Sequence, residues 1–271
     1  MAQEKPVQSV GVILKNGLDG KIASDIVRKF VAAGLRTYSL SDFTDKGVVK
    51  VENVEELKSL KLDAVVSVGG DGTLLRTLRT LQDDTPVLSI NVGHRGILSE
   101  IKPEEIDEAI TKLKNGEYLL DRRMRLSAKT CLELPPATNE IYLVRRLHIG
   151  TPYFTIRLSK TQLNVRMGGV IISTPTGSTG HAYSLKGPVL QENLEGVLIM
   201  PALPLQNMPP VVIIPQPITI KADHPTDLVI DGQEVYKVEA GEEVRITRYK
   251  YDANLIRLKD YTFKQLLRII S

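Results

Sequence analysis

Hydrophobic residues in the first hundred positions follow two patterns that alternate along the chain. Largely apolar runs, typical of strands buried on both faces, occupy residues 10–14, 64–68 and 87–90, and residues 37–40 have the composition of a further strand. Between the first two runs, Ile22, Ile26 and Phe30 recur at a spacing that predicts a helix ending at Gly34. Because strands that alternate with helices form parallel sheets, we predict a parallel α/β domain, a variant of the Rossmann-like arrangement.

A last helix of this half is predicted after Pro103, and beyond it the pattern changes. Ile106, Ile110 and Leu113 share one helical face, and Gly116 provides a stop signal. Short β-rich runs separated by proline, glycine and asparagine then follow at residues 153–158, 170–172, 197–200 and 218–220. Short strands with frequent turn residues predict an all-β antiparallel sandwich.

The end of the chain returns to a helical pattern. Phe263, Leu266, Leu267 and Ile270 lie at helical spacing and predict a helix whose apolar face needs a partner surface. We therefore expect this helix to pack back on the N-terminal domain. The expected division is an α/β domain over residues 1–120, an all-β sandwich over 121–248, and a returning C-terminal segment over 249–271.

Composition and charge exclude several classes of protein. Of the 271 residues, 42% are apolar and 25% are charged, which disfavours a disordered or fibrous chain. The net charge of +3 arises without long runs of one sign, and tryptophan is absent. We therefore expect neither a nucleic acid nor a membrane as a partner. No apolar run approaches the roughly 20 residues that span a bilayer.

Cysteine usage favours a reducing compartment. Cys131 is the only cysteine, so no intramolecular disulfide can form, and residues 1–6 lack the apolar stretch of a secretory signal. No cysteine or histidine lies at metal-ligand spacing from Cys131, so we expect a buried, inert thiol. The expected location is cytoplasmic.

The most distinctive local motif is Gly69-Gly70-Asp71-Gly72-Thr73, between the predicted strand 64–68 and a helical stretch. In α/β sheets, ligands bind at the carboxyl ends of strands, where helix N-termini offer N–H groups to phosphate and glycines allow close approach. Asp71 is the only ionisable residue of this turn, and beside a phosphate it suits a base or a ligand of Mg²⁺. In the alternative interpretation, Asp71 only caps the helix and the glycines only turn the chain.

A second loop favours the functional interpretation. The segment Thr174-Pro175-Thr176-Gly177-Ser178-Thr179-Gly180 follows the predicted strand 170–172 and combines hydroxyls with glycines. These are the groups that hold ribose and phosphate oxygens. Neither a Walker A pattern nor Gly-x-Gly-x-x-Gly follows the first strand, so a P-loop ATPase and an ordinary Rossmann dehydrogenase are not supported.

Five motifs, taken in order, resemble those of the NAD kinases over about residues 10–240. They are Gly69 to Thr73, Asn91-Val92-Gly93-His94-Arg95-Gly96, Asn139-Glu140, Ser173 to Thr179 and Asp231-Gly232-Gln233. The first is shared with diacylglycerol and sphingosine kinases, whereas the next three together are far more specific. The resemblance implies transfer of a phosphoryl group from ATP, another nucleoside triphosphate or polyphosphate to the 2′-hydroxyl of the adenosine ribose of NAD, forming NADP, with two domains joined around the site.

The resemblance also implies roles for individual residues. Asp71 matches the proton acceptor, and Arg76 matches a basic position that faces substrate phosphate. Asn139 and Glu140 match the pair that contacts adenine and ribose. The rest of the first motif matches a phosphate loop, Gly69, Gly70 and Thr73, and a nucleotide contact, Gly72. The remaining substrate-binding matches are Arg166, Thr179, Gly180, His181, Ala182, Tyr183, Ser184 and Gln233.

Several of these residues also have ordinary structural interpretations. Taken without the family, Asn139-Glu140 reads as a strand-edge turn and Arg166 as an exposed strand arginine. Asp231-Gly232 has the composition of a tight hairpin turn, which needs no function. For His94 and His148 we expect structural or solvent-facing roles.

The chain departs from the family pattern at two places. Gly168 stands where most relatives carry an acidic residue, which puts one ribose or nicotinamide contact in doubt. After Thr179 the chain reads Gly-His-Ala-Tyr-Ser, where relatives continue Ala-Tyr-Ser. A gapless alignment places His181 at the usual tyrosine position, whereas a two-residue slip would place Tyr183 there; we prefer the gapless alignment.

Cofactor and partner expectations follow from the same resemblance. A divalent cation, Mg²⁺ or similar, is expected to bridge the donor phosphates, without assigned protein ligands. Relatives form dimers or tetramers through the sandwich, so a homodimer or homotetramer is expected. Two alternatives stay open: a lipid or sphingoid kinase that shares the first motif, and a non-catalytic NAD-binding regulator suggested by Gly168 and the altered segment after Thr179. The donor, and the choice between NAD and NADH, also stay open.

Overall fold

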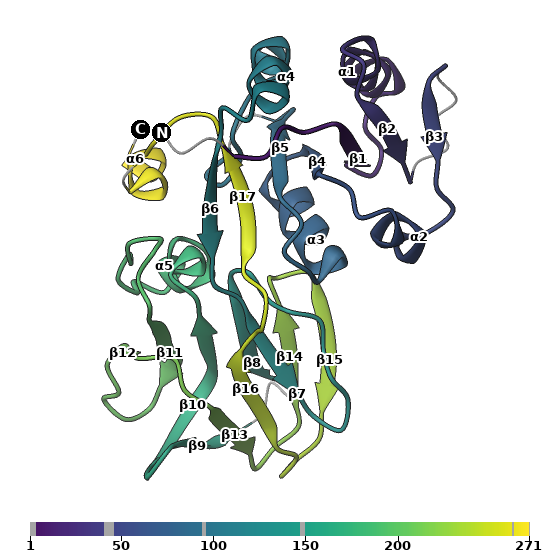
Figure 1. Ribbon diagram of the computed structural model, residues 1–271. Helices are drawn as coiled ribbons and strands as arrows, with labels where there is room; N and C mark the ends of the chain where they lie inside the picture. The colour runs from purple at the N-terminus through teal and green to yellow at the C-terminus, as the bar shows by residue number, and fades with distance from the viewer. Residues whose placement is uncertain (1–3, 41–45, 94–95, 147–149, 262, 271) are drawn as a thin grey trace. The chain divides into compact units, whose positions relative to one another are not determined.

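The computed structural model describes residues 4–40, 46–93, 96–146, 150–261 and 263–270. The chain forms two compact units (Figure 1). Unit 1 contains the residues up to Arg122 together with those from Ala253 onward, and unit 2 contains Arg123–Asp252. The C-terminal segment therefore belongs to the same unit as the N-terminus.

A seven-stranded sheet forms the centre of unit 1, in the order β3-β2-β1-β4-β5-β17-β6. Its strands are β1 (Ser9–Leu14), β2 (Arg36–Ser39), β3 (Val48–Lys50), β4 (Ala64–Gly69), β5 (Val87–Asn91), β6 (Leu119–Arg123) and β17 (Ala253–Arg257). The neighbours from β3 to β17 pair in parallel, which confirms the predicted parallel α/β region.

Helices cover both faces of this sheet. The helices are α1 (Gly20–Ala32), α2 (Val54–Ser59), α3 (Asp71–Leu81) and α4 (Ile106–Asn115), the last preceded by the 3₁₀ turn η1 (Pro103–Glu105). Val66 and Val68 of β4 belong to the core formed with α1 and α4, whereas Val65 belongs to the core formed with α2 and α3. This alternation follows from strand geometry, in which successive side chains point to opposite faces.

The helices predicted at residues 22–34 and after Pro103 are present, with an error in the predicted face of the first. Helix α4 buries Ile106, Ile110 and Leu113 and ends at Gly116, whose φ is +71°, as its sequence signals predicted. In α1, Ile26 and Phe30 are buried as predicted, together with Ala23 and Val27. Ile22, however, is 43% exposed. Ile22 lies in the first turn, where the side chain of Asp19 caps the helix by accepting from its backbone N–H.

Unit 2 consists of antiparallel strands, which confirms the predicted sandwich, here a half-barrel. Its strands are β7 (Leu126–Lys129), β8 (Glu140–Arg145), β9 (Tyr153–Leu158), β10 (Thr161–Ser173), β11 (Val197–Pro204), β12 (Val211–Ile213), β13 (Ile218–Ala222), β14 (Thr226–Ile230), β15 (Glu234–Val238) and β16 (Val244–Arg248). Two short helical turns, η2 (Thr176–Thr179) and α5 (His181–Ser184), follow β10.

Strand β10 joins the two layers of this unit. Its first part, up to Arg166, pairs with β9, and its last part, up to Ser173, pairs with β8 and β11. Gly168 and Gly169 lie where the partners change. A Cβ at Gly169 would lie 2.5 Å from the carbonyl oxygen of Leu143, so this crossing needs glycine, whereas a Cβ at Gly168 would meet atoms no nearer than 3.4 Å.

The C-terminal helix α6 (Lys264–Ile270) is present, but its predicted apolar face is wrong. Leu267 is 52% exposed and Ile270 is 72% exposed, whereas Lys264 and Gln265 are buried. The physical reason is an ion pair, because the ammonium of Lys264 meets the buried carboxylate of Glu100 in unit 1. The segment thus returns to unit 1 through strand β17 and a charged contact.

The cysteine prediction is also wrong. Cys131 is exposed, because it lies in the tight turn in which the backbone N–H of Thr130 donates to the carbonyl of Leu132. No helix within the described ranges is both long enough and apolar enough to cross a lipid bilayer.

Candidate functional site

The glycine-rich turn lies at the point where the sheet of unit 1 changes direction. Strands β1 and β4 are neighbours, and the chain continues from them toward opposite edges of the sheet, a point at which open α/β sheets bind ligands. Gly69 ends β4, and helix α3 begins at Asp71. A Cβ at Gly69 would lie 2.2 Å from the Oγ1 of Thr73, so only glycine fits there. Helix α3 begins directly after this turn, and helix N-termini are places at which proteins bind anions.

Asp71 is held by the loop after β5. Its Oδ2 accepts a hydrogen bond from the backbone N–H of Ile97 at 2.8 Å. Its Oδ1 accepts from the N–H groups of Leu98 and Ser99, each at 3.2 Å, and from the Ser99 hydroxyl at 3.1 Å. These contacts fix the carboxylate within the site and leave Oδ2 with the smaller number of donors.

Arg76 lies one helical turn further along α3 and reaches the end of β1. Its guanidinium donates to the Oδ1 of Asn16 and to the carbonyl of Leu14, both at 2.7 Å. The side chain therefore holds a positive charge at the carboxyl end of β1, next to the glycine-rich turn. Gly72, between Asp71 and Thr73, is exposed.

The second motif folds around Asn91, the last residue of β5. Its Oδ1 accepts from the N–H of Gly93 at 3.0 Å, and a Cβ at Gly96 would lie 2.7 Å from its Nδ2. Asn91 and the two glycines thus shape the loop that leads to the residues bound to Asp71. His94, Arg95 and His148 lie outside the described residues.

Unit 2 places Asn139 and Glu140 against the hydroxyl-rich loop. Glu140 begins β8 and pairs with Ser173, the last residue of β10. The N–H of Thr174 donates to the carbonyl of Asn139 at 2.9 Å. A Cβ at Gly177 would lie 2.1 Å from that same carbonyl oxygen, so only glycine lets the loop approach so closely. The third and fourth motifs therefore form one structure.

The hydroxyls of this loop bond to the protein backbone. Thr174 donates to the carbonyl of Thr138 at 2.6 Å, and Ser178 donates to the carbonyl of Pro175 at 2.7 Å. Thr179 donates to its own loop in the same way, at 3.2 Å. From the sequence we expected these hydroxyls to bind ribose and phosphate oxygens. In the structure their protons shape the loop instead.

Asn139 and Glu140 carry two of the buried polar atoms that have no partner among the described residues; the hydroxyls of Thr138 and Thr226 in this unit, and one guanidinium nitrogen each of Arg79 and Arg257, are the others. The Oδ1 of Asn139 and the Oε2 of Glu140 are buried and have no hydrogen-bond partner among the described residues. Gly180 lies beside them, since a Cβ there would be 3.4 Å from the Oε2 of Glu140. Burial, and then the nearby charge of Asp231, raise the pKa of Glu140 to about 8. Buried polar atoms without partners are rare, so these acceptors need a donor from outside the chain, such as a water molecule or a ligand.

Asp231 holds this pair in place, a role that the sequence did not indicate. Its carboxylate accepts from the backbone N–H groups of Thr138, Asn139 and Glu140 at 3.1, 2.7 and 3.3 Å. Asp231 and Gly232 both have positive φ and form the tight turn between β14 and β15. The turn signal accounts for both residues on its own, so nothing in the sequence showed that the side chain of Asp231 reaches β8.

The segment after Thr179 presents two exposed rings. The centroid of the His181 ring lies 5.0 Å from that of Tyr142 in β8, so His181 is anchored to the strand that Glu140 begins. Tyr183 is 45% exposed, Ser184 is also exposed, and Ala182 between these rings is fully buried. His181 is therefore the ring of this segment that packs beside the Asn139-Glu140 strand.

Gln233 and Arg166, two further residues predicted for the site, lie at different distances from Asn139 and Glu140. Gln233 is exposed in the hairpin turn next to Asp231. Arg166 is exposed on β10 and pairs with Tyr153, whereas Ser173 pairs with Glu140. Because a strand advances about 3.3 Å per residue, the seven steps from Arg166 to Ser173 span roughly 23 Å. Unit 2 by itself does not bring Arg166 to the other predicted residues.

A glycine-rich turn at an α/β switch point and a second unit with buried, unpartnered acceptors define a nucleotide-binding phosphotransferase. The sequence profile of the ATP-NAD kinase N-terminal domain matches residues 13–118, and that of the C-terminal domain matches residues 138–258. The chain belongs to the NAD kinase family.

Curated relatives and solved structures agree with this assignment. The chain is 31% identical to the NAD kinase of Methanosarcina acetivorans, over 90% of each chain, and 30% identical to that of Clostridium beijerinckii, over 97% of this chain and 95% of the relative. A crystal structure of an NAD kinase from Archaeoglobus fulgidus in complex with ATP matches with a TM-score of 0.78 and 27% identity, over 97% of each chain. Yeast NADH kinase complexed with NADH shares the fold, with a TM-score of 0.87 and 19% identity over 98% of this chain and 87% of the other.

Proposed function

We propose that this member of the NAD kinase family transfers a phosphoryl group from ATP to the 2′-hydroxyl of the adenosine ribose of NAD, forming NADP. Another nucleoside triphosphate or polyphosphate is the alternative donor. The observation that carries the proposal is the pair of buried acceptors, the Oδ1 of Asn139 and the Oε2 of Glu140, which have no hydrogen-bond partner within the described ranges. An adenosine supplies amino and hydroxyl donors of the kind that such acceptors need.

The residues of unit 2 would hold the adenosine. Asn139 and Glu140 would accept hydrogen bonds from adenine and ribose. Asp231 holds the backbone of both residues in place by accepting hydrogen bonds from their N–H groups. The segment Thr179 to Ser184 would line the nucleotide, with the His181 ring beside the base. Gln233 would contact the nucleotide from the neighbouring turn. Arg166 stays a weaker proposal because of its distance along β10.

The residues of unit 1 would act on the reacting groups. The backbone of Gly69, Gly70 and Thr73, with Gly72, would bind phosphate at the N-terminus of α3. Arg76 would provide positive charge for a substrate phosphate. Asp71 would orient the 2′-hydroxyl and accept its proton through Oδ2, which receives one hydrogen bond, from Ile97. Phosphoryl transfer depends mainly on such positioning and on charge, so a weak base suffices.

A divalent cation, Mg²⁺ or similar, is part of the proposal. Mg²⁺ is commonly bound by one or two carboxylates together with substrate phosphates. The lone pair of the Asp71 Oδ2 that the bond from Ile97 leaves open is assigned to the proton in our proposal, so the donor phosphates, and not Asp71, would hold the cation. When bound with the donor, the cation would neutralise charge on the phosphates.

The purified protein should convert NAD to NADP when ATP and Mg²⁺ are supplied. A strictly NADP-dependent dehydrogenase would detect the product, and parallel reactions with other triphosphates, polyphosphate and NADH would assign the donor and the acceptor. Formation of no NADP or NADPH with any of these donors would refute the proposal.

The two alternatives raised by the sequence are not favoured. A lipid or sphingoid kinase shares only the glycine-rich turn, whereas the family profiles cover both halves of this chain. A non-catalytic NAD-binding regulator does not need Asp71 or Arg76, and both are present.

Cys131, the single cysteine, is exposed and unpaired, which supports the proposed cytoplasmic location, where thiols stay reduced.

We propose that the chain assembles as a homodimer or homotetramer through unit 2. Large apolar side chains are exposed around β11 and β12: Leu203 at 73%, Leu205 at 67% and Ile214 at 74%. Exposed apolar side chains of this size are typical of interaction surfaces. Light scattering after gel filtration should give a mass of two or four times 30.0 kDa, and a monomer at micromolar concentration would contradict this.

A further inference from the structure

The loop that binds Asp71 is held from its other side by the C-terminal segment. Leu98 shows this most directly: its N–H donates to the Oδ1 of Asp71 at 3.2 Å, and its carbonyl accepts from the Nη1 of Arg257 at 2.8 Å. A single residue therefore connects the proposed base with strand β17, which is separated from it by the whole of unit 2 in the sequence. A shift of Arg257 would move the loop that fixes the Asp71 carboxylate.

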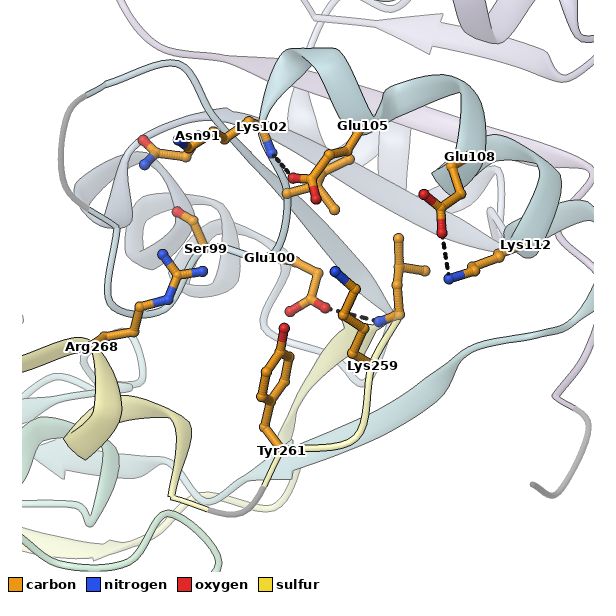
Figure 2. A pocket seen from close by; sticks show the side chains of 12 residues that line it. Asn91, Ser99, Glu100, Lys102, Glu105, Glu108, Lys112, Lys259, Tyr261 and Arg268 are labelled. Atoms are coloured by element: carbon orange, nitrogen blue, oxygen red, sulfur yellow. Dashed lines mark hydrogen bonds and ion pairs between the residues drawn. The ribbon is translucent and has the colours of Figure 1, made fainter. Parts of the chain in front are cut away.

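Glu100, the next residue but one, strengthens this connection. Its Oε1 accepts from the N–H of Leu258 at 2.9 Å, and its Oε2 accepts from the Nη1 of Arg257 at 3.1 Å. The ammonium of Lys264 in α6 also contacts Oε2. Figure 2 shows the Glu100 side chain turned toward the C-terminal segment, with Ser99 beside it in the same pocket wall. The loop is thus bonded to Asp71 on one side and to the C-terminal segment on the other.

This network is buried, unlike an ordinary surface ion pair. The side chains of Glu100, Lys264 and Arg257 are 2%, 4% and 5% exposed. Burial alone would raise the pKa of Glu100, but the charges of Lys264 and Arg257 outweigh it, so this pKa lies below its ordinary value. Buried pairs of this kind cost much to break, because removal of one member leaves the other charged and unpaired.

We propose that Arg257 and Lys264 are positioning residues for Asp71, which act by fixing the loop of residues 97–100, in which the N–H groups of residues 97–99 hold the Asp71 carboxylate. The expected effect on kcat rests on the proposed function. The expected effect on the loop of residues 97–100 does not. This role explains why α6 buries a lysine and a glutamine in place of its leucines, because the buried charge of Lys264 pairs with Glu100 of the loop.

The decisive experiment combines kinetics with hydrogen–deuterium exchange. The K264M variant should lower kcat about tenfold or more and leave KM for NAD within about twofold. Exchange in peptides that cover residues 97–101 should accelerate at least tenfold, while exchange in β4 stays as in the wild type. K264R keeps the charge and should restore both measurements. K259M, which removes an exposed lysine from the rim of the same pocket, is the matched control and should change neither.

A second variant keeps the test valid if K264M does not fold. The double variant E100Q/K264M removes both charges together, so no unpaired carboxylate remains buried. It should melt within a few degrees of the wild type and still show faster exchange at residues 97–101 with reduced kcat. A merely structural role would instead accelerate exchange throughout unit 1 and leave the kcat of the folded fraction unchanged.

A pH profile gives an independent measurement. Burial and then the charge of Arg257 lower the pKa of Lys264 to about 8, against the opposing effect of Glu100. Arg268 of the same helix adds a further lowering charge, and the ring of Tyr261 lies 5.1 Å from the ammonium. Raising the pH above about 8 neutralises Lys264, so wild-type kcat should fall there, and K264R should keep its kcat to higher pH.

The outcomes separate this inference from the proposed function. If K264M leaves both kcat and exchange at residues 97–101 unchanged, the positioning role is overturned whatever the substrate. If the wild type forms no NADP but K264M accelerates exchange only at residues 97–101, the loop connection stands and the proposed reaction fails. Identical pH profiles of the wild type and K264R would also overturn the inference.

Discussion

Replacement of Asp71 by asparagine should lower kcat by about 10²- to 10⁴-fold, the usual contribution of a general base. Asparagine keeps an oxygen that can accept from Leu98 and Ser99, so the loop should stay largely in place. What it loses is the charged Oδ2, which accepts from Ile97 and in our proposal takes the proton of the 2′-hydroxyl. Steady-state kinetics should therefore show a loss in kcat, and calorimetry should give a Kd for NAD within about threefold of the wild type.

The S99A variant tests whether Asp71 acts as the base or only holds the loop of residues 97–100 in place. The hydroxyl of Ser99 donates to Asp71 at 3.1 Å, and its removal leaves the carboxylate and three backbone donors in place. Loss of one such bond should lower kcat less than about tenfold. If the asparagine variant at position 71 keeps more than a tenth of the wild-type kcat, or if S99A loses as much as it does, Asp71 holds the loop and is not the base.

The hydrophobic pattern predicted four of the seven strands in the sheet of unit 1, β1, β2, β4 and β5, because a buried parallel strand forms an apolar run in the sequence. It did not predict β3, β6 or β17. At α6 the helix was predicted, but its buried face was predicted wrongly. There the helix is too short for its apolar spacing to decide its orientation, and the contact between Lys264 and Glu100 depends on a residue far away in the chain. Burial of a charge cannot be deduced from the helix alone.

The candidate site was predictable only where a motif is continuous in the sequence. The glycine-rich turn follows from local rules, because Gly69 must make room for Thr73 four residues later. Asn139 and Glu140 were indicated by family resemblance alone. Asp231, which holds both, acts through a tertiary contact, and its sequence context is fully explained by a hairpin turn. Contacts of this kind leave no local signal.

Replacement of Glu140 by glutamine should stabilise the free protein at alkaline pH. The pKa of Glu140 is raised from about 4.5 to about 8, so the folded state favours the neutral carboxyl. The wild type therefore loses stability as the pH rises from about 4.5 to about 8, at up to roughly 1.4 kcal/mol per unit. Glutamine carries no charge and has no such loss. Its melting temperature should equal that of the wild type near pH 5 and exceed it by several degrees near pH 9.

The same substitution should weaken NAD binding, because the site is built for a carboxylate that gains its partners from the ligand. Donors on the nucleotide favour the charged form, so wild-type affinity for NAD should increase with pH up to about 8. The glutamine variant should lose this pH dependence and bind NAD about 10- to 100-fold more weakly at pH 8, as expected for a hydrogen bond to a charged group. E133Q, a change at an exposed glutamate of unit 2 that pairs with Lys129, is the control and should alter neither quantity. Unchanged NAD affinity in E140Q would show that the unpartnered Oε2 does not mark the adenosine site.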